Sequence, residues 1–165
     1  MWSVRRAGNR CVTLRPTLAL SEETAAAILS ESAARLPNET GGILVGCAGA
    51  QAIEVVVAVG PGPRATHRRA YFRRDGDYAQ GELDQIYVAS NRRHDYLGEW
   101  HSHPLPVGPS GRDRHSMEWI ARNPDYDCPE PLLVLSQRGR EGEWGLAAFQ
   151  WTAGQLVRIP LAIAS

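Results

Sequence analysis

Apolar and polar positions alternate along the chain in patterns that predict both helices and strands. Residues 21–36 place apolar side chains at helical spacing and begin with a serine and two glutamates, as the first turn of a helix often does. Residues 41–46 and 53–59 are short apolar runs joined by a glycine-containing turn, which predicts two strands in the middle of a sheet. From Asp77 the helical spacing resumes.

The second half of the chain continues this mixture of elements. A helix is predicted over residues 112–122, because Asn123 and Pro124 follow it. Strands are predicted over residues 96–103, 131–137 and 144–151. A chain of 165 residues with 43% hydrophobic content has about the size and composition of one domain. We therefore expect a single domain over residues 1–165, with a mixed α/β sheet flanked by helices.

The stretch from Gly60 to Asp75 does not fit either pattern. It contains two prolines and five arginines, so we expect an exposed loop or an irregular segment at the edge of the sheet. Its arginines either solvate the surface or contact a substrate, and the composition leaves both readings open. The candidate substrate contacts are Arg64, Arg68 and Arg69.

Composition and charge exclude several classes of function. The 18 basic and 18 acidic residues balance, which argues against a nucleic-acid partner or an anionic membrane partner. Cys11, Cys47 and Cys128 are widely spaced and form no C-x-x-C pair, so we expect neither a disulfide framework nor a thiolate metal cage. We also expect a cytoplasmic protein, since no signal peptide or long apolar run is present.

His101 and His103 stand one residue apart on a predicted strand. Because side chains of a strand alternate with a period of two, both imidazoles point to the same face, with their Cα atoms about 6.5 to 7 Å apart. Such a pair can bind one zinc ion together with a third protein ligand, for which Asp113 is the candidate. Ser110 and Asp113 also have the spacing of a capping box, a structural role that is compatible with metal binding.

Hydrolysis of a peptide bond at such a metal also requires a carboxylate that takes a proton from water and gives it to the leaving amine. Glu99 and Glu39 are the two candidates. Glu99 shares the strand face of His101 and His103, whereas Glu39 lies just before a predicted neighbouring strand. The spacing of the residues does not decide between them.

Glu39 ahead of GGILVG, followed by GEWHSHP and PSGRD, resembles the motif of the JAMM (JAB/MPN-plus) metalloprotease family over residues 39–113. The resemblance implies a cytidine-deaminase-like α/β sandwich, with Glu39 as general base and acid, Ser110 supporting the oxyanion, and zinc on His101, His103 and Asp113. Glu99 would then have a supporting or structural role. One departure is that six residues separate His103 from Ser110, where the family usually has seven.

Hydrolytic members of this family cleave bonds after the C-terminus of ubiquitin or a ubiquitin-like protein. The GEWHSHP variant resembles the bacterial branch encoded beside ubiquitin-activating-like and conjugating-like enzymes, as in CBASS anti-phage operons. The resemblance therefore implies a zinc isopeptidase that acts on a ubiquitin-like modifier, with those enzymes as possible partners. One alternative is a protease that trims small β-grasp sulfur-carrier proteins. Another is a metal-free MPN scaffold, which the presence of all the motif residues disfavours.

The remaining histidines are not predicted to bind the metal. His67 and His94 fall at predicted loop or helix-end positions and are interpreted as surface histidines. His115 follows Asp113 by two residues on a predicted helix, which points it away from that aspartate.

Overall fold

The computed structural model describes residues 15–49 and 51–164. Its helices are α1 (Glu22–Ala34), α2 (Gly76–Ala89) and α3 (Gly111–Arg122), with a 3-10 turn η1 (Pro124–Tyr126). Its strands are β1 (Thr17–Ser21), β2 (Gly41–Ala48), β3 (Ala52–Val59), β4 (Thr66–Arg68), β5 (Tyr71–Arg73), β6 (Asp95–His103), β7 (Leu132–Arg138), β8 (Trp144–Thr152), β9 (Gln155–Ile159) and β10 (Leu161–Ala164). Every helix and strand expected from the sequence is present. The short strands β1, β4, β5, β9 and β10 were not predicted.

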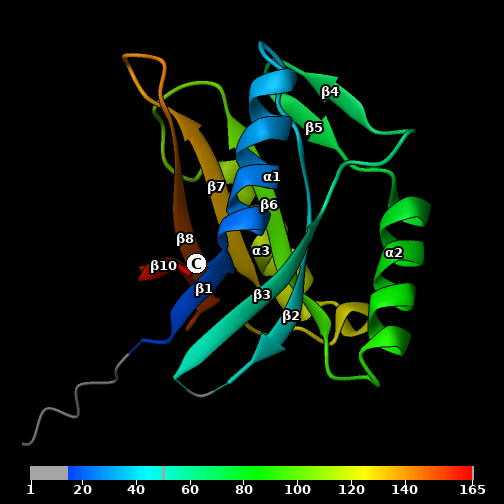
Figure 1. Ribbon diagram of the computed structural model, residues 1–165. Coiled ribbons are helices and arrows are strands. Elements are labelled where there is room, and N and C mark those ends of the chain that lie inside the picture. The colour runs from blue at the N-terminus through cyan, green and yellow to red at the C-terminus, as the bar shows by residue number, and fades with distance from the viewer. Residues whose placement is uncertain (1–14, 50, 165) are drawn as a thin grey trace, which may run out of the picture.

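Eight strands form one mixed sheet in the order β10-β1-β3-β2-β6-β7-β8-β9 (Figure 1). The central strand β6 pairs antiparallel with β2 and parallel with β7. The expected α/β class with a mixed central sheet is therefore confirmed. The first and last strands of the described chain lie side by side at one edge of the sheet, where β1 pairs parallel with β10.

Helices cover both faces of this sheet, and neighbouring residues of one strand supply the two cores. Leu44 of β2 belongs to the core beneath α1, whereas Ile43 and Val45 pack against α2 on the opposite face. In β7, Val134 joins the core of α1 and Leu135 that of α3, and both are fully buried. Figure 1 shows the result, a sheet sandwiched between helices. The alternation follows from the period of two in strands.

The segment from Gly60 to Asp75 differs from its expectation. Strands β4 and β5 pair antiparallel as a hairpin of their own, outside the main sheet (Figure 1). Arg74 is not exposed: its guanidinium forms a half-buried ion pair with Glu99. The prediction of an irregular, exposed loop was therefore wrong for the hairpin and for Arg74, because polar composition hides both the strand pairing and the internal salt bridge.

No helix among residues 15–49 and 51–164 is long and apolar enough to cross a membrane. Cys47 and Cys128 are free thiols, and Cys11 lies outside the described residues.

Candidate active site

His101 and His103 lie at the end of β6 and point to the same face of the sheet, with their ring centroids 4.9 Å apart. The prediction from strand periodicity is thus confirmed. Ser102, between them, points to the opposite face, where its hydroxyl accepts a hydrogen bond from the Thr40 amide. His103 Nδ1–H donates to the Val107 carbonyl at 3.3 Å, which directs Nε2 of that ring toward Asp113.

Ser110 and Asp113 form the expected capping box at the start of α3. The Ser110 hydroxyl accepts from the Asp113 amide at 3.2 Å, and the Ser110 amide donates to Asp113 Oδ2 at 2.6 Å. The same aspartate faces both histidines: Oδ1 lies 3.0 Å from His101 Nδ1, and Oδ2 lies 3.4 Å from His103 Nε2. The helix cap therefore aims the carboxylate at the pair of imidazoles, despite the shortened loop before Ser110.

Glu39 approaches the same histidines from the segment between α1 and β2. Its Oε2 lies 3.3 Å from His101 Nε2. One ligand atom each from Glu39, His101 and His103 lie within 4.8 Å of one another, a group that could hold a metal ion. His101 Nε2 is buried yet has no hydrogen-bond partner. Buried polar atoms are normally satisfied, so this nitrogen, which faces the Glu39 carboxylate while Nδ1 of the same ring faces Asp113, fits a bound cation.

The charges of this cluster reinforce one another. Burial disfavours a charged His101, but the hydrogen bond to Asp113 and the negative charge of the adjacent Glu39 outweigh burial and raise the pKa of the imidazole to about 9. Burial likewise disfavours an ionised Asp113, yet hydrogen bonds from His101, His103 and Ser110 hold the pKa of its carboxyl well below the usual range. The site therefore keeps a carboxylate ionised and attracts positive charge, whether a proton or a metal ion.

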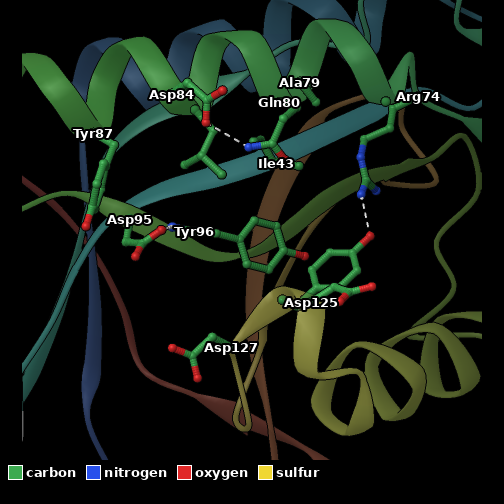
Figure 2. Close-up of a pocket in the computed structure, with 13 residues that line it drawn as sticks. Ile43, Arg74, Ala79, Gln80, Asp84, Tyr87, Asp95, Tyr96, Asp125 and Asp127 are labelled. Atoms are coloured by element: carbon green, nitrogen blue, oxygen red, sulfur yellow. Dashed lines mark hydrogen bonds between the residues drawn. The ribbon is translucent and has the colours of Figure 1, made fainter. Parts of the chain in front are cut away.

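Glu99 is engaged elsewhere. Its carboxylate pairs with Arg74 and lies 3.5 Å from the Tyr96 hydroxyl. Arg74 also donates to the Tyr126 hydroxyl at 2.9 Å. Both residues line a separate cavity of about 500 Å³ formed by residues of α2, β6 and the η1 turn, in which Figure 2 labels Arg74 and Tyr96. With its charge balanced by Arg74, Glu99 belongs to a network with Arg74 and Tyr96 and does not line the cleft of the two histidines.

The histidines open into a cleft of about 620 Å³. Its wall contains Leu36, Pro37, Glu39, Arg69, Ala70, His101, His103, Pro104, Leu105, Val107, Ser110, Arg112 and Arg138. Of the arginines proposed to contact substrate, Arg69 lines this cleft, and Arg68 lies exposed beside it on β4. Arg64 lies elsewhere and pairs with Asp75 at 3.0 Å and Asp77 at 2.6 Å.

Sequence reasoning missed several residues of the cleft. Leu105 and Val107 are 65% and 50% exposed, and they belong to the proline-rich loop that follows the histidines. Arg138 comes from the end of β7, and nothing in its local pattern indicates a site. His67 was interpreted as a surface histidine, but its Nδ1 lies 3.0 Å from the Glu39 carbonyl oxygen. Only the pairing of β4 with the Glu39 segment reveals that contact.

Comparison with known proteins identifies the family of the chain. Residues 21–152 match the family described as prokaryotic homologs of the JAB domain. A probable metalloprotease of Sinorhizobium fredii is 30% identical over 125 residues, covering 74% of this chain and 76% of that protein. A CD-NTase/cGAS isopeptidase of Enterobacter hormaechei is 32% identical over 136 residues, covering 80% and 73%. Another, from Vibrio cholerae, is 34% identical over 111 residues, covering 66% and 67%.

The fold has solved relatives as well. The solution structure of a Desulfitobacterium hafniense protein superposes with a TM-score of 0.65 at 16% identity, covering 90% of this chain and 93% of that one. At that identity the likeness concerns the fold alone. Together with the match over residues 21–152, these findings show that the chain belongs to the family of prokaryotic homologues of the JAB domain and is a hydrolase of the JAMM type.

Proposed function

We propose that the protein is a zinc-dependent isopeptidase that cleaves after the C-terminus of a ubiquitin-like modifier, either to process the modifier or to remove it from a target. The observation that carries this proposal is the meeting of two histidines, two carboxylates and a serine at one cleft. The relatives named as isopeptidases and as a probable metalloprotease add support.

His101, His103 and Asp113 are the proposed metal ligands. Asp113 contacts both imidazoles, whereas Glu39 contacts only His101, so Asp113 is the better third ligand. Two nitrogens and one oxygen are a ligand set that zinc accepts in catalytic sites, where a fourth position stays open. When bound there, zinc polarises a carbonyl group and acidifies water.

Glu39 is then the proposed general base and acid. Its carboxylate lines the cleft beside His101, where it can accept a proton from water and pass it to the leaving amine. Ser110 is the proposed oxyanion donor. Its hydroxyl oxygen accepts from the Asp113 amide in the helix cap, and Ser110 lines the cleft, where the hydroxyl could donate to a developing oxyanion.

The surroundings of the cleft suit an extended substrate tail. Exposed Leu105 and Val107 offer apolar contacts and Arg69 offers a positive charge, and all three line the cleft. The β4–β5 hairpin beside them offers a strand edge for β-augmentation, in which main-chain hydrogen bonds hold an extended peptide. Ubiquitin-activating-like and conjugating-like enzymes would be the partners that make the conjugates.

Three relatives are named CD-NTase/cGAS isopeptidase. For this chain we therefore propose the C-terminus of a CD-NTase as a second candidate substrate, beside the C-terminus of a ubiquitin-like protein. Each of these two tails, and the tail of a β-grasp sulfur carrier, would be fused to the same reporter. The kcat/KM values for cleavage would then rank the three candidate substrates.

The decisive experiment pairs zinc content with cleavage of these fusions. Wild type is expected to hold about one zinc and to cut at least one fusion, as three-ligand catalytic sites do. Asp113→Asn should lose both properties, whereas the matched control Asp125→Asn, an exposed aspartate outside the cleft, should keep both. A wild-type protein without zinc or cleavage would refute the proposal and favour an MPN scaffold.

A further inference from the structure

The main chain of Glu39 forms hydrogen bonds with two consecutive residues of β4. The Glu39 amide donates to the Arg68 carbonyl at 2.8 Å, and the Glu39 carbonyl lies 3.0 Å from His67 Nδ1. A carbonyl oxygen can only accept, so this contact requires the proton of His67 on Nδ1. The hairpin thus satisfies both backbone polar groups of the residue proposed as the general base.

The next residue, Thr40, is fixed from the other side. Its amide donates to the Ser102 hydroxyl at 2.9 Å, its carbonyl accepts from the Ser102 amide at 2.8 Å, and both residues are fully buried. Glu39 therefore stands between a residue tied to the central strand β6 and a hairpin outside the main sheet. The direction of the Glu39 carboxylate therefore depends on the hydrogen bonds between the Glu39 main chain and the hairpin.

The hairpin is itself packed against the site. Phe72, directly opposite His67 in the β4–β5 pair, has its ring centroid 5.4 Å from that of His67 and 6.1 Å from that of His101. Gly41 permits this approach, because a Cβ there would lie 2.8 Å from the Phe72 ring. On the far side, Arg112 of α3 donates to the Ala70 carbonyl at 2.9 Å.

We propose that His67 is a positioning residue, which holds the Glu39 carboxylate at the reacting end of the cleft through the hydrogen bond to the Glu39 carbonyl. The proposal rests on the proposed role of Glu39. It also separates two tasks: the histidines and Asp113 are fixed by the central sheet and a helix cap, whereas the general base takes its direction from the hairpin.

Two substitutions divide the hydrogen bond of His67 from its ring packing. His67→Asn places an amide nitrogen where Nδ1 stands and keeps the donor, but it removes the ring that faces Phe72. His67→Phe keeps a ring and removes the donor. If the hydrogen bond positions Glu39, the phenylalanine variant should lose about tenfold to a hundredfold in kcat, with KM and zinc content unchanged, because small misplacements of a reacting group are costly. The asparagine variant should stay within about threefold of wild type.

A second measurement needs neither metal nor turnover. In the zinc-free protein, amide hydrogen exchange of Glu39 should be about fivefold faster in His67→Phe than in wild type, since the segment loses one hydrogen bond. The Thr40 amide, bonded to Ser102, is the internal control and should keep its rate. The proposal would be overturned if His67→Phe kept the exchange rate and kcat of wild type while His67→Asn changed them. It would also be overturned if the loss of kcat in His67→Phe were explained by a lower zinc content. A wild-type enzyme that cuts nothing would count against the proposed function alone, because the exchange result would still judge the role of His67.

Discussion

Exchanging Glu39 and Glu99 for glutamine, one at a time, should separate turnover from stability. Both carboxylates are candidates for the general base by their position in the sequence, but the structure gives them different neighbours. Glu39 lies 3.3 Å from His101 Nε2, in the cleft, whereas Glu99 forms an ion pair with Arg74. The two substitutions remove the same charge from two different networks.

Glu39→Gln should bind zinc, stay as stable as wild type within about 1 kcal/mol, and lose about 10²-fold to 10⁴-fold in kcat, the usual contribution of general acid–base catalysis. Glu99→Gln should leave the guanidinium of Arg74 half-buried without its carboxylate partner, while the neutral Tyr126 hydroxyl still accepts a hydrogen bond from it. Breaking a fully buried pair costs about 3 to 5 kcal/mol. Because these two side chains are 22% and 21% exposed, we expect roughly 2 to 3 kcal/mol here.

For a chain of this size, that loss corresponds to a decrease in Tm of roughly 4 to 12 °C. Thermal unfolding followed by circular dichroism would measure it, and the cleavage assay with a ubiquitin-like fusion would measure kcat at a temperature where both variants are folded. A Glu99→Gln protein that unfolds like wild type but no longer cuts would refute the assignment of the base to Glu39.

Three further results are expected. Ser110→Gly should retain stability to within a few tenths of a kcal/mol, about the difference between serine and glycine at an N-cap, yet lose about 10²-fold in kcat with the oxyanion donor; similar kcat values would remove the hydroxyl from the mechanism. Arg69→Glu should raise KM for an extended tail, while Arg68→Glu, exposed beside the cleft, should change it little; equal effects would point to general charge alone. The zinc-free protein should lose stability as pH rises from 6.5 to about 9, because protonated His101 has the raised pKa, and again as pH falls below about 4, because ionised Asp113 has the lowered one. With zinc bound the alkaline loss should vanish, since the metal displaces the proton, and scans of Tm against pH with and without chelator would show it.

The parts of the site that depend on local spacing could be predicted from the sequence. His101 and His103 share a face because a strand alternates every two residues, and Ser110 and Asp113 interlock because a helix begins between them. Glu39 could be selected only by resemblance to a family motif. Its position depends on the register of β2 against β6, which pairs Gly41 with His101, and no local pattern fixes such a register.

The features that were misread are those made by distant segments. The composition around His67 and Arg74 is that of a loop, yet one residue supports Glu39 and the other neutralises Glu99. The edge strand β10 and its neighbour β1 were also missed. They pair parallel with each other across almost the whole length of the chain, so neither segment shows by itself that it has a partner.

The place of β6 between β2 and β7 has a consequence for the zinc-free protein. The two histidines cannot move apart without breaking hydrogen-bonded ladders on both sides, so their arrangement exists before any metal arrives. Removal of zinc should therefore leave the fold and the walls of the cleft in place. A chelator would then convert the enzyme into a receptor for its own substrate, which captures the tail of a modifier and keeps it intact.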